Sequence, residues 1–129
     1  GERFLVDLPG YGYAKVPRGM RNEWELLISG YLQLRPQLRG LIVIMDIRHP
    51  MKPLDRQLLG WFEGTGRPAH ILLTKADKLG RQPAIEQLRN TTKILATDFP
   101  AVSVQLFSAQ TRVGIDEAEA VLNRWYAPA

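Results

Sequence analysis

Short apolar runs alternate with longer segments of helical periodicity along the 129-residue chain, and this alternation limits the possible folds most. The apolar runs lie at residues 4–6, 41–45, 71–73 and 102–107. Each is followed by a segment whose apolar residues recur every three or four positions, as on one face of a helix. Four such strand–helix units predict an α/β fold, a parallel sheet with helices on both faces.

Proline and glycine bound the expected helices. The run at residues 41–45 is uninterrupted and partly β-branched, which predicts a strand covered on both faces. The first two expected helices span about residues 19–35 and the segment from Pro53 to the closing Gly64 and Gly66. The third begins at Pro83, with Ile85, Leu88 and Leu95 facing inward. The fourth runs from about Ile115 to Trp125, with Ala118, Val121 and Leu122 facing inward.

Composition excludes some classes of protein and leaves others open. The chain has no cysteine, which rules out disulfides and thiolate metal sites and fits a reducing, cytoplasmic compartment. The apolar runs are too short to span a bilayer. Seventeen Lys and Arg against thirteen Asp and Glu favour anionic partners, RNA among them. We expect one domain over residues 1–129; its start, without Met in a strand-like stretch, suggests a chain cut inside a fold.

The loops after the strands are the places to look for function. Right-handed crossovers bring the C-terminal ends of parallel strands to one edge of the sheet, and ligands bind at that edge. After the first strand, the Asp7 carboxylate can hold Mg²⁺ through a bound water, and the Gly10 N–H can approach a terminal phosphate. Pro9 stiffens the loop between them. An ordinary tight turn is the alternative.

The loop after the third strand carries a carboxylate suited to guanine. Asp77 can accept hydrogen bonds from guanine N1–H and the exocyclic amine, whereas adenine lacks both donors at these positions. The alkyl stem of Lys75 can lie over a purine face. The alternative is a solvated charge cluster before a helix.

The loop after the fourth strand is small and polar. A backbone N–H beside Ala109 can reach guanine O6, and Ser108 can brace the loop; the alternative is a polar turn with a helix cap. The three loops occur in order, each at the end of an expected parallel strand. Their combination predicts a guanine-nucleotide site.

These motifs resemble those of the EngB family of bacterial P-loop GTPases, in the translation-factor-related class. Residues 7–10 match Asp-x-x-Gly, residues 74–77 match Asn/Thr-Lys-x-Asp, and residues 107–109 match the Ser-Ala loop. The stretches at residues 6–14 and 46–50, with Leu54-Asp55 downstream, resemble EngB in particular, and the likeness covers essentially the whole chain.

The resemblance implies a GTP-binding protein that uses GTP/GDP and Mg²⁺, acts in assembly of the large ribosomal subunit and is linked to cell division and septation. It assigns no catalytic residue. The residues that it implies for the nucleotide are Asp7, Leu8, Pro9, Gly10, Thr74, Lys75, Ala76, Asp77, Phe107, Ser108 and Ala109, with Asp7 also at Mg²⁺.

Two departures from the family pattern matter. The chain has no Gly-x-x-x-x-Gly-Lys-Ser/Thr, so a partial P-loop GTPase fold is expected, without the phosphate-loop strand that lies between the strands at 4–6 and 41–45. We expect the chain alone to be incompetent for GTP hydrolysis, and to be destabilised, to close the gap, or to pair with another chain. Tyr11 replaces the water-orienting glutamine of Ras-like enzymes, which implies slow hydrolysis.

Two other interpretations stay open. One is a nucleotide-independent docking module for ribosomal RNA or protein, with Lys15, Arg18 and Arg21 as a basic contact or simply a solvated helix start. The other is a flavodoxin-like domain in which the motifs are turns. Among single residues, His49 and His70 are interpreted as structural and Asp46 as a partner of Arg48.

Overall fold

The computed structural model describes residues 39–126, with the Tyr126 side chain excepted. The predicted strand at residues 4–6 and the helix at about 19–35 lie outside the described residues. The described elements are β1 (Leu41–Asp46), α2 (Pro53–Glu63), β2 (Ala69–Thr74), the short 3-10 helix η1 (Ala76–Lys78), α3 (Arg81–Asp98), β3 (Val102–Leu106) and α4 (Ile115–Tyr126). They make up three of the four predicted strand–helix units.

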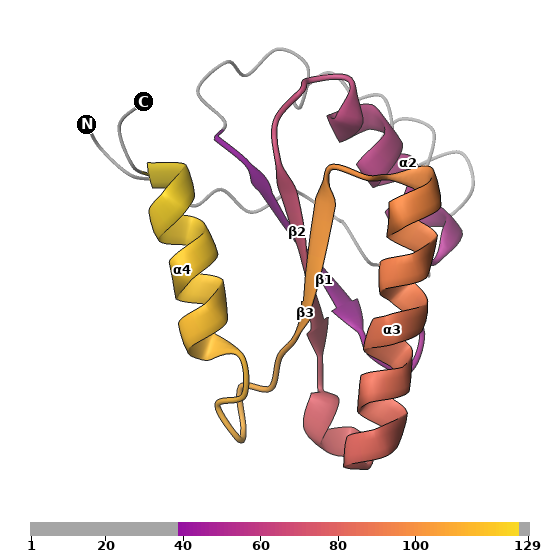
Figure 1. The fold of residues 1–129 in the computed structure, drawn as a ribbon, viewed down its shortest axis with the longest axis vertical. Helices are drawn as coiled ribbons and strands as arrows, with labels where there is room; N and C mark the ends of the chain where they lie inside the picture. Colours follow the sequence, from indigo (N-terminus) through magenta and orange to yellow (C-terminus); the bar gives the residue numbers. More distant parts are fainter. Residues whose placement is uncertain (1–38, 127–129) are drawn as a thin grey trace, which may run out of the picture.

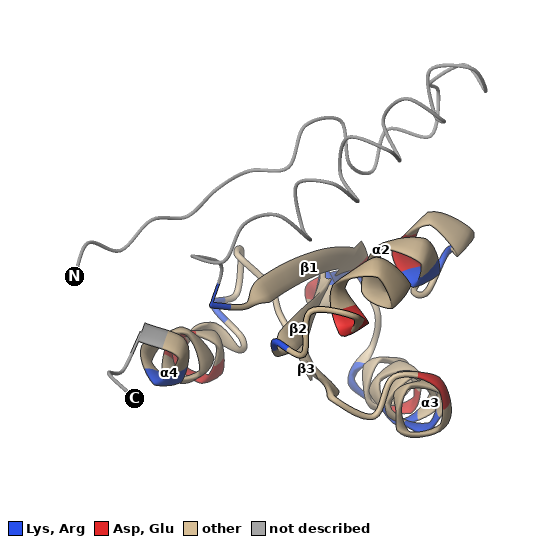
Figure 2. Cartoon of the chain, turned by 90° about the horizontal axis from the view of Figure 1, so that it is seen from above, with Lys and Arg blue, Asp and Glu red and all other residues tan. Residues whose placement is uncertain are grey.

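The three strands form one parallel sheet in the order β1-β2-β3. Leu41 pairs with Ala69 and Asp46 with Thr74, so β1 and β2 end level with each other. Helices α2 and α3 lie on one side of the sheet and α4 on the other (Figures 1 and 2). The predicted α/β architecture, with helices on both faces, is therefore confirmed for the described residues.

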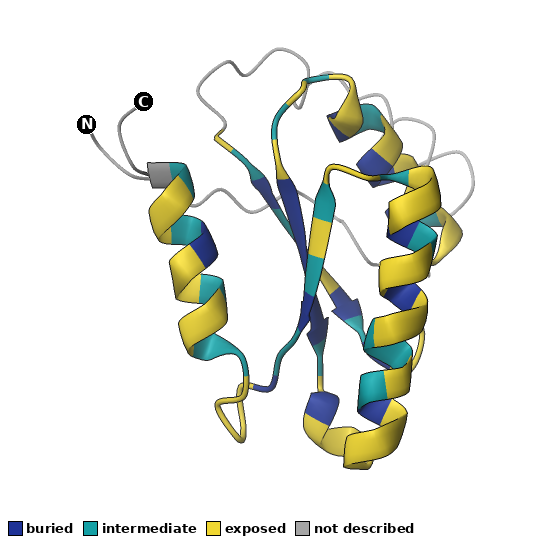
Figure 3. Ribbon diagram, viewed as in Figure 1, coloured by how far each residue is buried: buried dark blue, intermediate teal, exposed yellow. Residues whose placement is uncertain are grey.

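The main core lies between the sheet and helices α2 and α3 (Figure 3). Alternate residues of β1 and β2 point into it, because successive side chains of a strand face opposite sides. On the helix side, Leu58, Leu59 and Phe62 of α2 are each about 1% exposed. Burying one such side chain contributes about 1.5–3 kcal/mol, so this face supplies most of the stability that the described elements share.

A smaller contact joins α4 to the start of β1. A Cβ at Gly40 would lie 2.6 Å from Cε3 of Trp125, so only glycine allows the indole to approach the backbone this closely. Val121, one helical turn earlier, is also buried. Of the residues predicted to face inward, Val121 is buried and Ala118 and Leu122 are half-buried.

Three details of the prediction are wrong. Ile44, in the run expected to be covered on both faces, is 60% exposed, because it points to the face of β1 opposite the buried Val43 and Met45, where the described elements give little cover. Helix α3 begins at Arg81, two residues before Pro83, since proline is tolerated in the first helical turn. Ile85 is only half-buried. The stripe that faces the core runs through Ala84, Leu88, Thr91 and Leu95.

Candidate functional site

Two loops meet at the C-terminal edge of the sheet, at the lower end of Figure 1. The Lys75 loop (residues 75–80) follows β2 and contains η1, and the Ser108 loop (residues 107–114) follows β3. The second and third sequence motifs occupy these loops, at residues 74–77 and 107–109. The first motif, Asp7 to Gly10, lies outside the described residues, and with it the predicted Mg²⁺ ligand Asp7.

Backbone hydrogen bonds continue the sheet pairing into both loops. The Phe107 N–H donates to the Leu73 carbonyl at 2.9 Å, and the Ala76 N–H donates to the Phe107 carbonyl at 3.1 Å. The Ser108 N–H donates to the Val113 carbonyl at 3.0 Å and closes the Ser108 loop. The two motifs are therefore held side by side by main-chain geometry.

A side-chain hydrogen bond joins the two motifs directly. The Ser108 hydroxyl, 1% exposed, donates to Oδ1 of Asp77 at 2.7 Å and accepts from the Thr111 N–H at 3.2 Å. Asp77 itself is exposed. An ionised carboxylate has about four acceptor positions, so a single bond from Ser108 orients it and leaves capacity for a ligand. Ser108 thus braces the loop in the way the sequence suggested.

Lys75 has a backbone conformation that few residues other than glycine adopt. Its φ is 60° and its ψ 33°, in the left-handed region. The side chain is 56% exposed, and its Nζ lies 3.4 Å from Oδ2 of Asp46, at the end of the neighbouring strand. The preceding Thr74 hydroxyl donates to the Met45 carbonyl at 3.2 Å, which ties this loop to β1 a second time.

Asp46 has a closer partner in Arg48. Its carboxylate accepts from the Arg48 backbone N–H at 2.9 Å, from Nε at 3.0 Å and from a terminal guanidinium nitrogen at 2.7 Å. The side-chain hydrogen bonds from Arg48 hold the pKa of Asp46 well below its ordinary value of 3.8, against a smaller opposing effect of burial. The expected Asp46–Arg48 pair is confirmed, and the additional contact with Lys75 was missed.

Behind the Ser108 loop lies a buried polar network that sequence reasoning also missed. Gln105, 1% exposed, donates through Nε2 to the Gly114 carbonyl at 2.7 Å and to the Leu106 carbonyl at 3.0 Å. Its Oε1 lies 2.8 Å from Nε2 of His70. The other ring nitrogen of His70, Nδ1, lies 2.6 Å from the Ser103 hydroxyl. A polar residue among apolar positions of β3 was the available signal.

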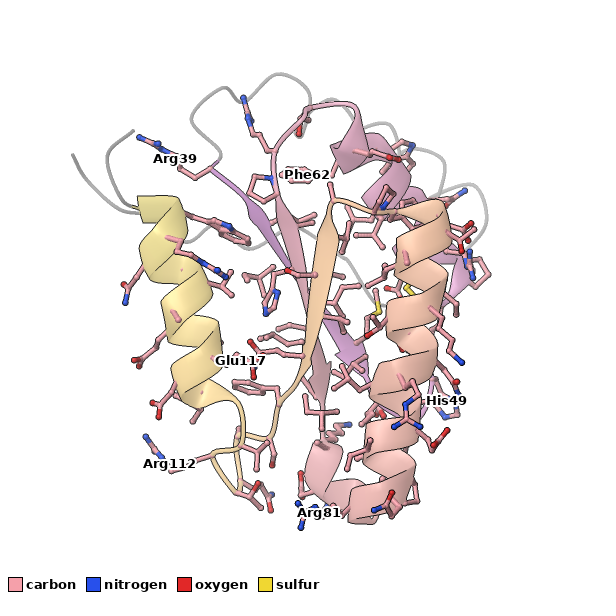
Figure 4. All side chains as sticks on the ribbon, in the orientation of Figure 1. Arg39, His49, Phe62, Arg81, Arg112 and Glu117 are labelled. Carbon is pink, nitrogen blue, oxygen red and sulfur yellow. The ribbon has the colours of Figure 1, made fainter. Side chains whose placement is uncertain are left out.

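The remaining side chains near this edge have simpler roles. His49 is exposed on the loop after β1, where its N–H donates to the Asp46 carbonyl at 2.9 Å, in agreement with a structural role. Figure 4 shows Arg81 and Arg112 near this end of the molecule and Phe62 near the opposite end. Residues 39–126 contain no group of three or more His, Cys, Asp or Glu placed to hold a metal ion.

The two loops present hydrogen-bonding groups to solvent at this edge of the sheet. An oriented carboxylate at Asp77 can accept from two neighbouring donors, and the backbone beside the exposed Ala109 can donate to an oxygen. Lys75 adds an exposed side chain whose ammonium lies at Asp46. No described helix is long and apolar enough to cross a membrane.

Comparison with known proteins shows extended sequence similarity. The chain is 53% identical over 128 residues to the "Probable GTP-binding protein EngB" of Methylobacillus flagellatus and 54% identical over 127 residues to that of Thiobacillus denitrificans. Each alignment covers 98% of this chain. Over nearly its whole length the chain is therefore similar to EngB proteins. It spans about 62% and 61% of the length of these two EngB relatives. No family model matches it.

Solved structures support the same fold. A crystal structure described as a probable GTP-binding protein EngB superposes with a TM-score of 0.68 over 92% of this chain and 75% of that one, at 15% identity. Elongation factor SelB from Methanococcus maripaludis, solved with the GTP analogue GppNHp, superposes with a TM-score of 0.62 over 81% of this chain and 24% of that one, at 18% identity. At these identities the likeness shows the fold alone.

Proposed function

We propose that the Lys75 and Ser108 loops form the base-reading half of a guanine-nucleotide site, in a protein that binds GTP and GDP. The observation that carries this proposal is the hydrogen bond from the buried Ser108 hydroxyl to the exposed Asp77 carboxylate. It pre-orients an anionic acceptor at the sheet edge where parallel α/β folds bind ligands. The names of the relatives, probable GTP-binding proteins, support the same conclusion.

Each residue has a stated part in recognition. The Asp77 carboxylate accepts from guanine N1–H and from the 2-amino group, and the backbone at Ala109 donates to O6. The stem of Lys75 covers one face of the base, and Thr74, Ala76 and Phe107 hold the loops. Hydrogen bonds to a charged group contribute about 1.5–3 kcal/mol each. Adenine would leave the Asp77 charge unpaired, so we expect a much lower affinity for adenine nucleotides than for guanine nucleotides.

The phosphate half of the site belongs to residues beyond the described part. Asp7 would hold Mg²⁺, and the backbone between Leu8 and Gly10, stiffened by Pro9, would approach the terminal phosphate. Bound Mg²⁺ would neutralise charge on the phosphates during GTP hydrolysis. Tyr11 cannot orient a water as an amide does, so we expect the GTPase activity of the complete protein to be slow.

The direct test is titration with fluorescent GDP, competed with GTP and ATP. Two proteins are compared: this chain, and the chain extended at its N-terminus by the corresponding segment of the Methylobacillus relative. We expect the extended protein to bind and GTP but not ATP to compete, with much weaker binding by the chain alone. An extended protein that ignores guanine nucleotides would leave the docking-module interpretation in its place.

A single substitution tests the assigned role of Asp77. In Asp77→Asn the amide NH₂ opposes the guanine 2-amino group but suits the 2-oxo group of xanthine. We expect GDP affinity of the extended protein to fall about 10- to 100-fold, the range given by one lost charged hydrogen bond, and affinity for xanthosine diphosphate to rise. Asp98→Asn is the matched control, since Asp98 is an exposed carboxylate at the far end of α3, paired with Arg56. Equal losses in both variants would count against the assignment.

The biological setting is a second part of the proposal. We propose that the complete protein acts in the cytoplasm on the large ribosomal subunit, and through it in cell division and septation. The excess of Lys and Arg over Asp and Glu supports an RNA-rich partner. Co-sedimentation with purified large subunits, with GTP, with GDP and without nucleotide, tests this. Equal binding in all three states would favour a nucleotide-independent docking module.

A further inference from the structure

We propose that Asp46 is a positioning residue for the nucleotide site: through its contact with Lys75, it holds the lysine stem where a bound base needs it. This inference rests on the proposed guanine-nucleotide function. Asp46 lies at the end of β1, outside both loops, and its carboxylate meets the second motif through the Lys75 ammonium, 3.4 Å from Oδ2.

Strand register brings the two residues together. Asp46 is paired with Thr74 in the parallel ladder, so the residue after Thr74 emerges beside the Asp46 carboxylate. Two bonds keep this register beyond the strands: the Ile47 N–H donates to the Thr74 carbonyl at 3.0 Å, and the Thr74 hydroxyl donates to the Met45 carbonyl at 3.2 Å. The juxtaposition follows from the sheet rather than from a chance meeting of surface side chains.

The Asp46 carboxylate is itself held firmly. Arg48 occupies Oδ1 with its backbone N–H and Nε and contacts Oδ2 at 2.7 Å, so the carboxylate has one fixed orientation. Its side chain is 22% exposed, against 56% for Lys75. A fixed, ionised carboxylate therefore stands beside a flexible ammonium. The lysine is the mobile partner and Asp46 the anchor.

Anchoring matters more for binding than for stability. A half-exposed ion pair contributes little to folding, because water screens the charges and the long side chain loses freedom. If the Lys75 side chain became ordered only when a base binds, the loss of its conformational entropy would weaken binding. Holding Nζ at Asp46 orders the stem beforehand. Loss of Asp46 should therefore weaken nucleotide binding while leaving the fold nearly as stable.

Arg48 provides the discriminating control. It shares Oδ2 with Lys75 but lies on the loop after β1, and among the described residues its side-chain hydrogen bonds go to Asp46 alone. If Asp46 acted through the shape of its own loop, removing Arg48 would reproduce the effect of removing Asp46. If Asp46 acts through Lys75, removing the Arg48 guanidinium leaves the carboxylate held by the backbone N–H of residue 48 and available to the lysine.

The test is a double-mutant cycle on the N-terminally extended protein, read as fluorescent GDP affinity together with melting temperature. We expect Asp46→Asn to weaken GDP binding about fivefold, but by less than twofold in the Lys75→Met background. The GDP affinity of Arg48→Gln should stay within twofold of that of the unmodified protein.

Equal effects of Asp46→Asn in both backgrounds, or an Arg48→Gln loss as large as that of Asp46→Asn, would overturn the inference. Should Asp46→Asn not fold, Asp46→Glu is carried through the same cycle and judged by the same coupling to Lys75. Absence of GDP binding by the unmodified extended protein would instead refute the proposed function on which the inference rests.

Discussion

Single hydroxyl and carboxylate groups determine how the two loops meet. Ser108 is buried while its partner Asp77 is exposed, so the hydroxyl has no competing water and the carboxylate keeps its orientation toward solvent. Under the proposed function, a carboxylate oriented in this way lowers the ordering cost of ligand binding. The effect of removing the hydroxyl can be separated from a general loss of stability.

We expect Ser108→Ala to lower the GDP affinity of the extended protein about tenfold, the value of one hydrogen bond to a charged group. Thr92→Ala is the control, because its exposed hydroxyl also makes one short bond, to the Leu88 carbonyl at 2.7 Å, within α3. GDP titration and thermal melting of both variants separate the effects. A comparable loss of GDP affinity in Thr92→Ala would show that the Ser108 effect is not specific.

Among the elements, the connection from β3 to α4 is the most tightly constrained. Gly114 has φ 83°, and its carbonyl accepts from Gln105 Nε2 at 2.7 Å. A Cβ at this position would lie 2.1 Å from the Leu106 carbonyl oxygen, which is a backbone atom and cannot swing away. The Ser108 loop therefore depends on a glycine at its end and on the Gln105 network behind it.

Two glycine-to-alanine substitutions should act in opposite directions. Gly114→Ala combines a positive φ with a backbone clash, and we expect it to lower the free energy of unfolding by about 2–3 kcal/mol. Gly60→Ala, in the middle of α2 with open space around the new Cβ, should raise that free energy by about 0.5–1 kcal/mol. Urea titrations of both variants provide the comparison. Similar shifts of the same sign would contradict this account of the β3–α4 connection.

For the molecule as a whole, the uncovered side of β1 is the main weakness of the described part. Ile44 is 60% exposed at the edge of the sheet, while Val43 beside it is 1% exposed. An edge strand with an exposed apolar side chain offers unpaired backbone groups to another strand or chain. Stability should therefore depend on what covers this edge.

We expect the N-terminally extended protein to melt at a higher temperature than the chain alone, because added residues can pair with the β1 edge and bury Ile44. Thermal melting combined with light scattering after size-exclusion chromatography measures both stability and self-association. A chain that stays monomeric and melts as high as the extended protein would show that the β1 edge needs no cover.

Local patterns were enough to predict most of the described fold. Residues 41–46, 69–74 and 102–106 form strands and α2, α3 and α4 follow them, because hydrophobic periodicity and glycine or proline boundaries act over a few neighbouring residues. The same patterns placed residues 74–77 and 107–109 at strand ends. The errors at Ile44, Arg81 and Ile85 concern coverage by distant elements or the exact helix start, which local patterns specify weakly.

The sequence by itself determined the order of strands and helices, the motif positions and the family resemblance, since each of these depends on residue types and their spacing. Only the tertiary structure decided which side chains meet. Ser108 reaches Asp77 across 31 residues, and Lys75 reaches Asp46 across the β1–β2 pairing. Such contacts depend on strand register and on a left-handed backbone at Lys75, which no local pattern of residues specifies.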